Sequence, residues 1–265
     1  MAIRRREDIL KRSREMRRKR RSIQRIVFVV LLIALIGASL VAVNVSTFAI
    51  KSILVRGTTS VPSGDVELLA RKDIAGSYFY LVPRASVFFY PHATLLKDIS
   101  ALSPRIASVQ MHVSATRILV IDIMERSQRY LWCRESTDCL YLDDNGFAFA
   151  HAFTGKGLPY PIFDIGSSTP TLERVALPPS TFIPLARFID TLPSGVTRVR
   201  IEGQRSEISM AAGYRLIVNT YTDFATARKN LAVTLASPEL TVPLSRGTTL
   251  QYIDLRVPEK VFYKF

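Results

Sequence analysis

Histidine, cysteine and tryptophan are scarce in this sequence of 265 residues, which contains three, two and one of them. The histidines, His92, His112 and His151, lie far apart, and none pairs with another at the spacing of metal ligands. The sequence also lacks a phosphate-binding glycine loop and a Gly-x-Ser-x-Gly motif. We therefore expect no metal, no cofactor, no small-molecule substrate and no enzymatic activity, and we interpret the histidines as surface or packing residues.

The adjacent acids Asp143 and Asp144 are the pair that could be imagined as a catalytic dyad. They belong to Asp143-Asp144-Asn145-Gly146, which lies between two short apolar runs. Asn-Gly at such a place indicates a β-hairpin, and Asp side chains there accept hydrogen bonds from the nearby backbone. We therefore interpret the two acids as turn residues.

Positive charge is concentrated at the start of the chain. Residues 4–25 hold 12 of the 36 basic residues against three acids, a net +9 of the whole chain's +14. A basic chain can indicate nucleic-acid binding. Here the charge directly precedes an apolar run, so residues 1–25 are interpreted as a basic cytoplasmic tail, with no nucleic acid as partner.

The apolar run that follows is long enough to cross a bilayer. Residues 26–50 carry no charge, and about 20 apolar residues span a hydrocarbon core. We predict a single transmembrane helix at 26–47, with Met1 in the cytoplasm and the C-terminal region outside the plasma (inner) membrane. The alternative is a cleaved signal peptide ending near Gly37-Ala38-Ser39. The long basic region and the continuing apolar run favour the anchor.

Both cysteines fall outside the membrane in this topology. Cys133 ends one short apolar run and Cys139 begins the next, with a polar turn between them. Oxidising conditions permit a bridge across such a hairpin, and we predict a disulfide between them. A metal site with two cysteines would need further ligands, and His151 is the sole histidine nearby.

The outer region begins with alternating strand and helix patterns. From 48 to 126 the order is β-α-α-β-β, with an aromatic loop around Tyr78, Phe79 and Tyr80 between the helices. The expected strands are 48–56, 108–113 and 117–125. One helix is expected to begin at Val61-Pro62-Ser63, with Asp65 and Glu67 in its first turn, and a second helix is expected at 91–102.

The rest of the chain, 127–265, is mostly β with two amphipathic helices, at 180–192 and 223–236. Strands are expected near 140–142, 147–149, 196–201, 207–211, 215–221, 249–257 and 260–265. Strands beside a few helices indicate an α+β fold. In the strand 249–257, alternation predicts Ile253, Leu255 and Val257 on the core side.

Several different short patterns follow one another along the chain. They are Ile53-x-Val55-x-Gly57-x-x-x-Val61, the segments Pro104–Met111 and Ile118–Arg126, Trp132 with Tyr141–Phe147, and Tyr252–Val257. With the basic tail and single anchor, this order resembles the FtsQ/DivIB family of bacterial cell-division proteins. The resemblance implies a POTRA-like domain at 48–126 and an FtsQ-type β domain at 127–265. Two features depart from the family: the turn before Ile118 lacks the usual proline, and the cysteine pair is not expected.

The resemblance implies a non-enzymatic bitopic scaffold at the division septum. Its expected partners are other single-pass division proteins (FtsB/FtsL-like), and the implied binding site is a sheet edge near the C-terminal strands, where a partner adds a strand. The candidate residues of this edge are Tyr252, Asp254, Arg256, Val257, Val261, Phe262 and Tyr263. Pro258 supports an edge position because proline cannot donate to a ladder.

Other interpretations stay open. Val261, Phe262 and Tyr263 could simply close the sheet without binding anything. The chain could also be a POTRA-containing protein of secretion or outer-membrane assembly, a membrane-anchored cell-wall enzyme, or an anchored sensor. An enzyme would need a nucleophile or metal constellation, which the sequence does not offer.

Overall fold

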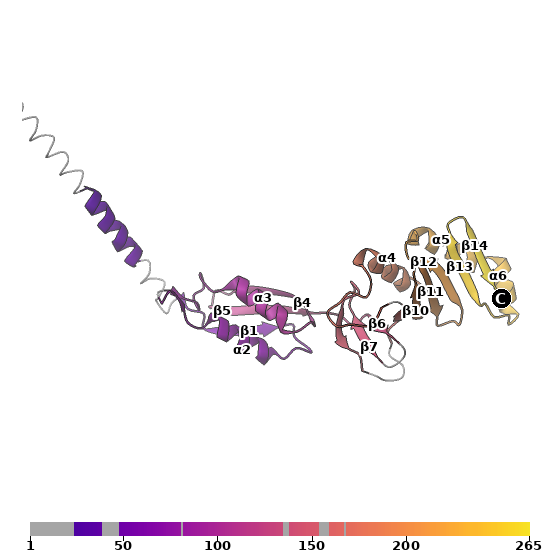
Figure 1. The fold of residues 1–265 in the computed structure, drawn as a ribbon, viewed down its shortest axis with the longest axis horizontal. Helices are drawn as coiled ribbons and strands as arrows, with labels where there is room; N and C mark the ends of the chain where they lie inside the picture. The colour runs from indigo at the N-terminus through magenta and orange to yellow at the C-terminus, as the bar shows by residue number, and fades with distance from the viewer. Residues whose placement is uncertain (1–23, 39–47, 81, 135–137, 154–158, 167) are drawn as a thin grey trace, which may run out of the picture. The chain divides into compact units, whose positions relative to one another are not determined.

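A computed structural model describes residues 24–38, 48–80, 82–134, 138–153, 159–166 and 168–265 (Figure 1). Residues 24–38 form a helix, and all of them are exposed. Within the part of the chain that is described, no helix has both the length and the hydropathy needed to cross a bilayer. The predicted membrane helix includes residues 39–47 and the predicted tail includes 1–23, which lie outside the described residues, and both stay predictions.

The chain forms two compact units. The first comprises residues 1–102 and 108–123, and the second comprises 103–107 and 124–265. Strands and helices mix in both, so the predicted α+β class is confirmed. The domain bounds assigned from the sequence stay a prediction.

The first unit has a three-stranded sheet in the order β1-β5-β4. Its strands are β1 (Ser52–Arg56), β4 (Ile106–Val113) and β5 (Ile118–Glu125), and its helices are α2 (Ser63–Ile74) and α3 (His92–Leu102). β1 runs parallel to β5, while β4 and β5 are neighbours joined by a short turn. The predicted order β-α-α-β-β is confirmed for these five elements, and two short strands between the helices were not predicted.

Local sequence explains the two helices. α2 begins after Pro62 and carries the acid Asp65 in its first turn and the bases Arg71 and Lys72 in its last turn. The helix dipole favours negative charge at the N-terminus and positive charge at the C-terminus. α2 buries Val66, Ala70 and Ile74, which recur every fourth residue. α3 buries Leu95 and Ile99 and stops before Pro104, since the residue preceding a proline disfavours helix.

The connection between α2 and α3 differs from the loop that was expected. It contains a small antiparallel hairpin of β2 (Ser77–Tyr78) and β3 (Val82–Pro83). Phe79 and Tyr80 at its tip have positive φ values of 50° and 60°. Such tips usually carry Gly or Asn. Because aromatic residues occupy this tip instead, no turn signal in the sequence indicated a hairpin.

The second unit has a nine-stranded sheet in the order β14-β13-β12-β11-β10-β9-β6-β7-β8 (Figure 1). Its strands are β6 (Tyr130–Cys133), β7 (Cys139–Leu142), β8 (Ala148–His151), β9 (Ile162–Ile165), β10 (Val196–Glu202), β11 (Arg205–Met210), β12 (Arg215–Asn219), β13 (Tyr252–Val257) and β14 (Lys260–Lys264). Its helices are α4 (Pro179–Asp190), α5 (Phe224–Leu235) and α6 (Pro238–Ser245).

Two helical crossovers join parallel strands in this sheet. α4 lies between β9 and β10, and α5 with α6 lies between β12 and β13; both strand pairs are parallel. The other pairs of neighbouring strands are antiparallel, except that β9 is also parallel to β6. β9 therefore joins the hairpin strands β6–β8 to the strands β10–β14.

Aromatic side chains form the centre of this unit. Tyr130, Phe163 and Phe182 are buried, with ring centroids between 5.0 and 5.5 Å apart. Burial raises the pKa of Tyr130, whose hydroxyl donates to Asp190 at 3.0 Å. Gly146 lies against this cluster, because an added Cβ would be 2.7 Å from the Phe182 ring. Its glycine thus permits both the turn, at φ +76°, and the close packing.

Candidate functional site

The candidate binding edge is the strand β14, which stands at one end of the nine-stranded sheet. It pairs with β13 on one side, in the antiparallel register Tyr252↔Lys264, Ile253↔Tyr263 and Asp254↔Phe262. Among the described strands it has no neighbour on the other side. An edge of this kind presents backbone groups to which a further strand can add.

The two faces of β14 differ. Val261 and Phe265 pack against the main hydrophobic cluster of the unit, and Tyr263 stands opposite the buried Ile253. Phe262 is on the other face and is 52% exposed, whereas Tyr263 is 37% exposed. The strand is thus attached to the core by one face and offers an aromatic side chain on the other.

The structure separates the seven predicted edge residues into two groups. Val261, Phe262 and Tyr263 lie on the terminal strand β14. Tyr252, Asp254, Arg256 and Val257 lie on β13, which is an internal strand between β12 and β14. Since both neighbours of β13 are strands of the same sheet, its residues cannot form the edge to which a partner strand would add.

The predicted faces of β13 also need a correction. Ile253 and Leu255 are buried as expected, but Val257 is 43% exposed and Asp254 is buried. The register with β14 shifts between Asp254 and Val257. A β-bulge of this kind adds a residue to one strand and reverses the alternation beyond it, so the residues after Leu255 no longer follow the core pattern.

Asp254 and Arg256 neutralise one another at this bulge. The Arg256 guanidinium donates to both carboxylate oxygens of Asp254, at 2.6 to 3.0 Å, and its backbone N–H donates at 3.0 Å. Burial alone would raise the pKa of Asp254, but these hydrogen bonds outweigh burial and leave that pKa lowered. The pair therefore fixes the bulge, and Asp254 is an internal structural acid.

The turn between β13 and β14 is held from α5. The Asn230 side-chain amide donates to the carbonyl of Pro258 at 2.7 Å. Leu231 on the same helix is buried in the main cluster. α5 thus positions the hairpin that carries the edge, and nothing in the sequence pattern identified Asn230 for this role.

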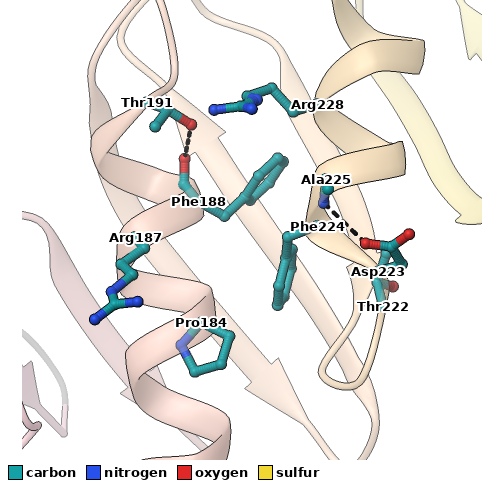
Figure 2. Close-up of a pocket in the computed structure, with 9 residues that line it drawn as sticks. All are labelled: Pro184, Arg187, Phe188, Thr191, Thr222, Asp223, Phe224, Ala225 and Arg228. Atoms are coloured by element: carbon teal, nitrogen blue, oxygen red, sulfur yellow. Dashed lines mark hydrogen bonds between the residues drawn. The ribbon is translucent and has the colours of Figure 1, made fainter.

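A cavity of about 470 Å³ lies between α4 and α5 (Figure 2). The stacked rings of Phe188 and Phe224, 5.0 Å apart, lie at its centre, with Arg187 and Arg228 among its lining residues. Asp223 accepts from the Thr226 hydroxyl and from the Ala225 N–H, and these hydrogen bonds lower its pKa. The bond from Ala225 caps α5.

The cysteines stand directly opposite each other in the β6–β7 ladder. The structure joins Cys133 and Cys139 in a disulfide, with the two Cα atoms 4.2 Å apart. Cys133 is 1% exposed. The bridge therefore ties a four-residue strand to its neighbour beside a turn, which is a structural role.

Of the two adjacent acids, Asp143 forms the expected turn contacts, whereas Asp144 accepts from the side chains of Ser127 and Arg129, at 3.3 and 2.9 Å. One oxygen of Asp143 accepts from the backbone N–H groups of Asn145 and Phe147, at 2.9 and 3.0 Å. The other oxygen accepts from Arg126 at 2.6 Å. Arg126 also donates to the Pro104 carbonyl and lies 4.4 Å from the Phe147 ring centroid. The partnership with Arg126 was not visible in the sequence, because 17 residues separate the two charges.

The three histidines are exposed and belong to three different helices or strands. His92 begins α3, His112 lies on β4 near Asp122 at 3.7 Å, and His151 ends β8. No group of three or more possible metal ligands occurs within the described residues.

Comparison with known proteins gives little. No family model matches the chain, and no curated protein matches it. Among solved structures, it is similar to the major extracytoplasmic domain of the trans isomer of the bacterial cell-division protein DivIB from Geobacillus stearothermophilus. That match has 14% sequence identity and a TM-score of 0.27, and covers 47% of this chain and 98% of that domain. A likeness of this size carries no argument about fold or function.

Proposed function

We propose that this protein is a non-enzymatic, single-pass membrane scaffold of the septal cell-division machinery, of the FtsQ/DivIB type. The proposal is supported by the ordered sequence patterns described above and by the β-α-α-β-β arrangement of the first unit, which is the arrangement expected for a POTRA-like domain. In this proposal the outer region presents surfaces to partners and performs no chemistry.

Anchoring in the plasma membrane is supported by the helix at 24–38. Its large apolar side chains are exposed, from Leu32 at 47% to Phe28 at 68%. Apolar side chains exposed on every side of a helix need a cover, and lipid provides one. The preceding basic residues orient the N-terminus toward the cytoplasm. A periplasmic-type reporter fused after Phe265 should therefore be active, and an inactive one would reject this topology.

Partner capture is assigned to β14. The observation that carries this assignment is the position of β14 at the end of the sheet, with its outer side unpaired among the described strands. A partner segment would add as a tenth strand and bond to the β14 backbone, while Phe262 packs against its side chains.

The charges of β14 select between possible partners. Lys260 and Lys264 are both exposed at its two ends. In an antiparallel pairing of two copies centred on Phe262, Lys260 of one copy would face Lys264 of the other. Like charges opposite one another destabilise a strand pair, whereas acids on a partner strand would stabilise it. The favoured occupant is thus an acidic segment of another single-pass division protein (FtsB/FtsL-like).

The test compares two matched aromatic substitutions in the full chain. Phe262→Asp changes the exposed face of β14, and Tyr221→Asp changes a residue that is 75% exposed after β12. Co-purification of the bacterial host's bitopic division proteins should fall about tenfold for Phe262→Asp and stay unchanged for Tyr221→Asp. Val261→Pro and deletion of residues 261–265 should reduce capture further.

Two outcomes would reject the assignment. Capture that survives both Phe262→Asp and deletion of 261–265 would place the partner site elsewhere. Equal losses for Phe262→Asp and Tyr221→Asp would indicate a nonspecific effect of added charge. Amide exchange of β10 to β12 serves as the folding control, because these strands should stay protected in every variant.

A further inference from the structure

The connection between α2 and α3, residues 75–91, exposes several aromatic side chains. Phe79 and Tyr80 are 91% and 98% exposed, and Phe88 and Phe89 are 66% and 48% exposed. Single exposed apolar residues are ordinary, but four within eleven residues are not explained by packing. They indicate a surface that meets a partner.

The backbone at the hairpin tip supports this. Phe79 and Tyr80 both adopt left-handed φ values, which cost a non-glycine residue of order 1–3 kcal/mol each. That cost is usually offset by buried contacts, but both side chains are almost fully exposed within the chain. Contacts of these two side chains within the folded unit therefore do not offset the cost.

This connection is tied to the start of the outer region. The Val87 N–H donates to the Phe48 carbonyl at 2.9 Å, and the Ile50 N–H donates to the Ala85 carbonyl at 2.7 Å. The rings of Phe48 and Phe88 are 5.4 Å apart. Phe48 directly follows the predicted membrane span 26–47, and consecutive Cα atoms are about 3.8 Å apart. A chain anchored by that span holds Phe48, and Phe88 with it, at the level of the lipid headgroups.

We propose that Phe48, Phe79, Tyr80, Phe88 and Phe89 form an aromatic membrane-contact surface that inserts into the headgroup region of the outer leaflet. The inference rests on the anchor of the proposed function and goes beyond it. Aromatic rings are favoured at the membrane–water interface, because their apolar faces enter the acyl boundary. The exposed Lys51, three residues after Phe48, adds a charge attracted to anionic headgroups. The occupant of this surface is the bilayer.

The experiment uses single tryptophan reporters in the full chain. The one native tryptophan, Trp132, is 3% exposed in the second unit and gives a constant background. Phe79→Trp and Phe88→Trp place reporters on the proposed surface, and Tyr221→Trp places one at an exposed site of the second unit. The protein is reconstituted into phosphatidylethanolamine–phosphatidylglycerol vesicles with and without dibrominated acyl chains, which quench tryptophan on contact.

Phe79→Trp and Phe88→Trp should each lose about half of their added fluorescence in brominated vesicles, since interfacial side chains lie roughly 5–10 Å into the boundary. Tyr221→Trp should lose none. Quenching of all three reporters to the same extent, or of none of them, would overturn the inference. So would fluorescence of Phe79→Trp and Phe88→Trp that brominated lipid does not quench and that shifts in wavelength only after a bitopic partner is added, because that result assigns the surface to a protein.

A fourth reporter separates this inference from the proposed function. Phe28→Trp lies in the helix at 24–38 and should be quenched strongly in any membrane-anchored chain. If Phe28→Trp is quenched while Phe79→Trp and Phe88→Trp are not, the anchor stands and the aromatic surface alone is rejected. If Phe28→Trp is not quenched, the anchor itself is rejected.

Discussion

The two compact units place their aromatic side chains in opposite ways. In the second unit, the hydrophobic core includes the buried rings of Tyr130, Phe163 and Phe182. In the first, the buried side chains among the described residues are aliphatic apart from Ser86, and several aromatic ones of the α2–α3 connection are exposed. An aromatic residue of the second unit is thus explained by folding, whereas those of the α2–α3 connection require something outside the unit.

The largest expected effect is on the aromatic centre of the second unit. Phe182→Ala removes a fully buried ring that touches both Tyr130 and Phe163, and should lower the free energy of unfolding by about 3–5 kcal/mol. Trp132 fluorescence during urea titration measures it. The counterpart in the first unit, Phe88→Ala, should change stability by less than about 0.5 kcal/mol. Similar losses from both would abolish the contrast.

The stability of the first unit is expected to depend more on glycine positions in its backbone than on aromatic packing. Gly57 has a φ of +79°, and a Cβ there would lie 2.1 Å from the carbonyl oxygen of Ile123. Gly57→Ala should therefore cost about 3 kcal/mol, from left-handed strain and a clash with backbone that cannot move aside. Gly76→Ala is the matched control, because its φ is +82° but nothing lies within 4 Å. Gly76→Ala should lower the free energy of unfolding by only about 1 kcal/mol. Hydrogen-exchange protection of β1 and β5 measures both variants.

A smaller change in the free energy of unfolding is expected from the charge pair Asp254 and Arg256 of the second unit. The lowered pKa of Asp254 means that its carboxylate stabilises the fold above the ordinary pKa of 3.8, and that this stability is lost as pH falls through the lowered value. Arg256→Ala should lower stability at pH 7 by about 1–2 kcal/mol. The difference from the parent should shrink below about pH 4 in urea titrations. A difference independent of pH would indicate packing by the Arg256 stem.

The smallest effect has the opposite sign and belongs to the first unit. Burial raises the pKa of Asp73, and the neighbouring carboxylate Asp98 raises it further. A raised pKa favours the protonated acid, so its contribution is present below pH 3.8 and is lost as pH rises through the folded value. Asp98→Asn should stabilise the first unit at pH 7 by about 0.5 kcal/mol. Lys72→Gln should do the reverse, because Lys72 lowers that pKa.

Much of the fold could be predicted because local patterns coincide with the final structure. The helices at 180–192 and 223–236 were expected from apolar spacing and are observed as α4 and α5 within two residues. The strands of the hairpin around Gly146 followed from one Asn-Gly pair. The terminal position of β14 agrees with the proline that precedes it.

The missed elements depend on contacts distant in sequence. β9 is four residues long, and both of its partners are parallel strands more than 25 residues away. α6 contains Pro238 at its start and Pro243 inside, so its pattern did not resemble a helix. The exposure of Val257 follows from a bulge that pairing with β14 creates. In each case tertiary contacts overrode the local preference.

The position of β9 has a consequence for how the second unit opens. This single short strand lies between two groups of strands, β6 to β8 and β10 to β14, and pairs with both groups. Loss of its pairing would leave two smaller sheets, each held by its own hairpins, so the unit contains two candidate foldons that share one boundary. The amides of Phe163 and Ile165, both buried, should exchange with solvent only in the opening that separates these foldons. Their protection therefore reports the cooperativity of the whole sheet, including the distant strand that carries Phe262.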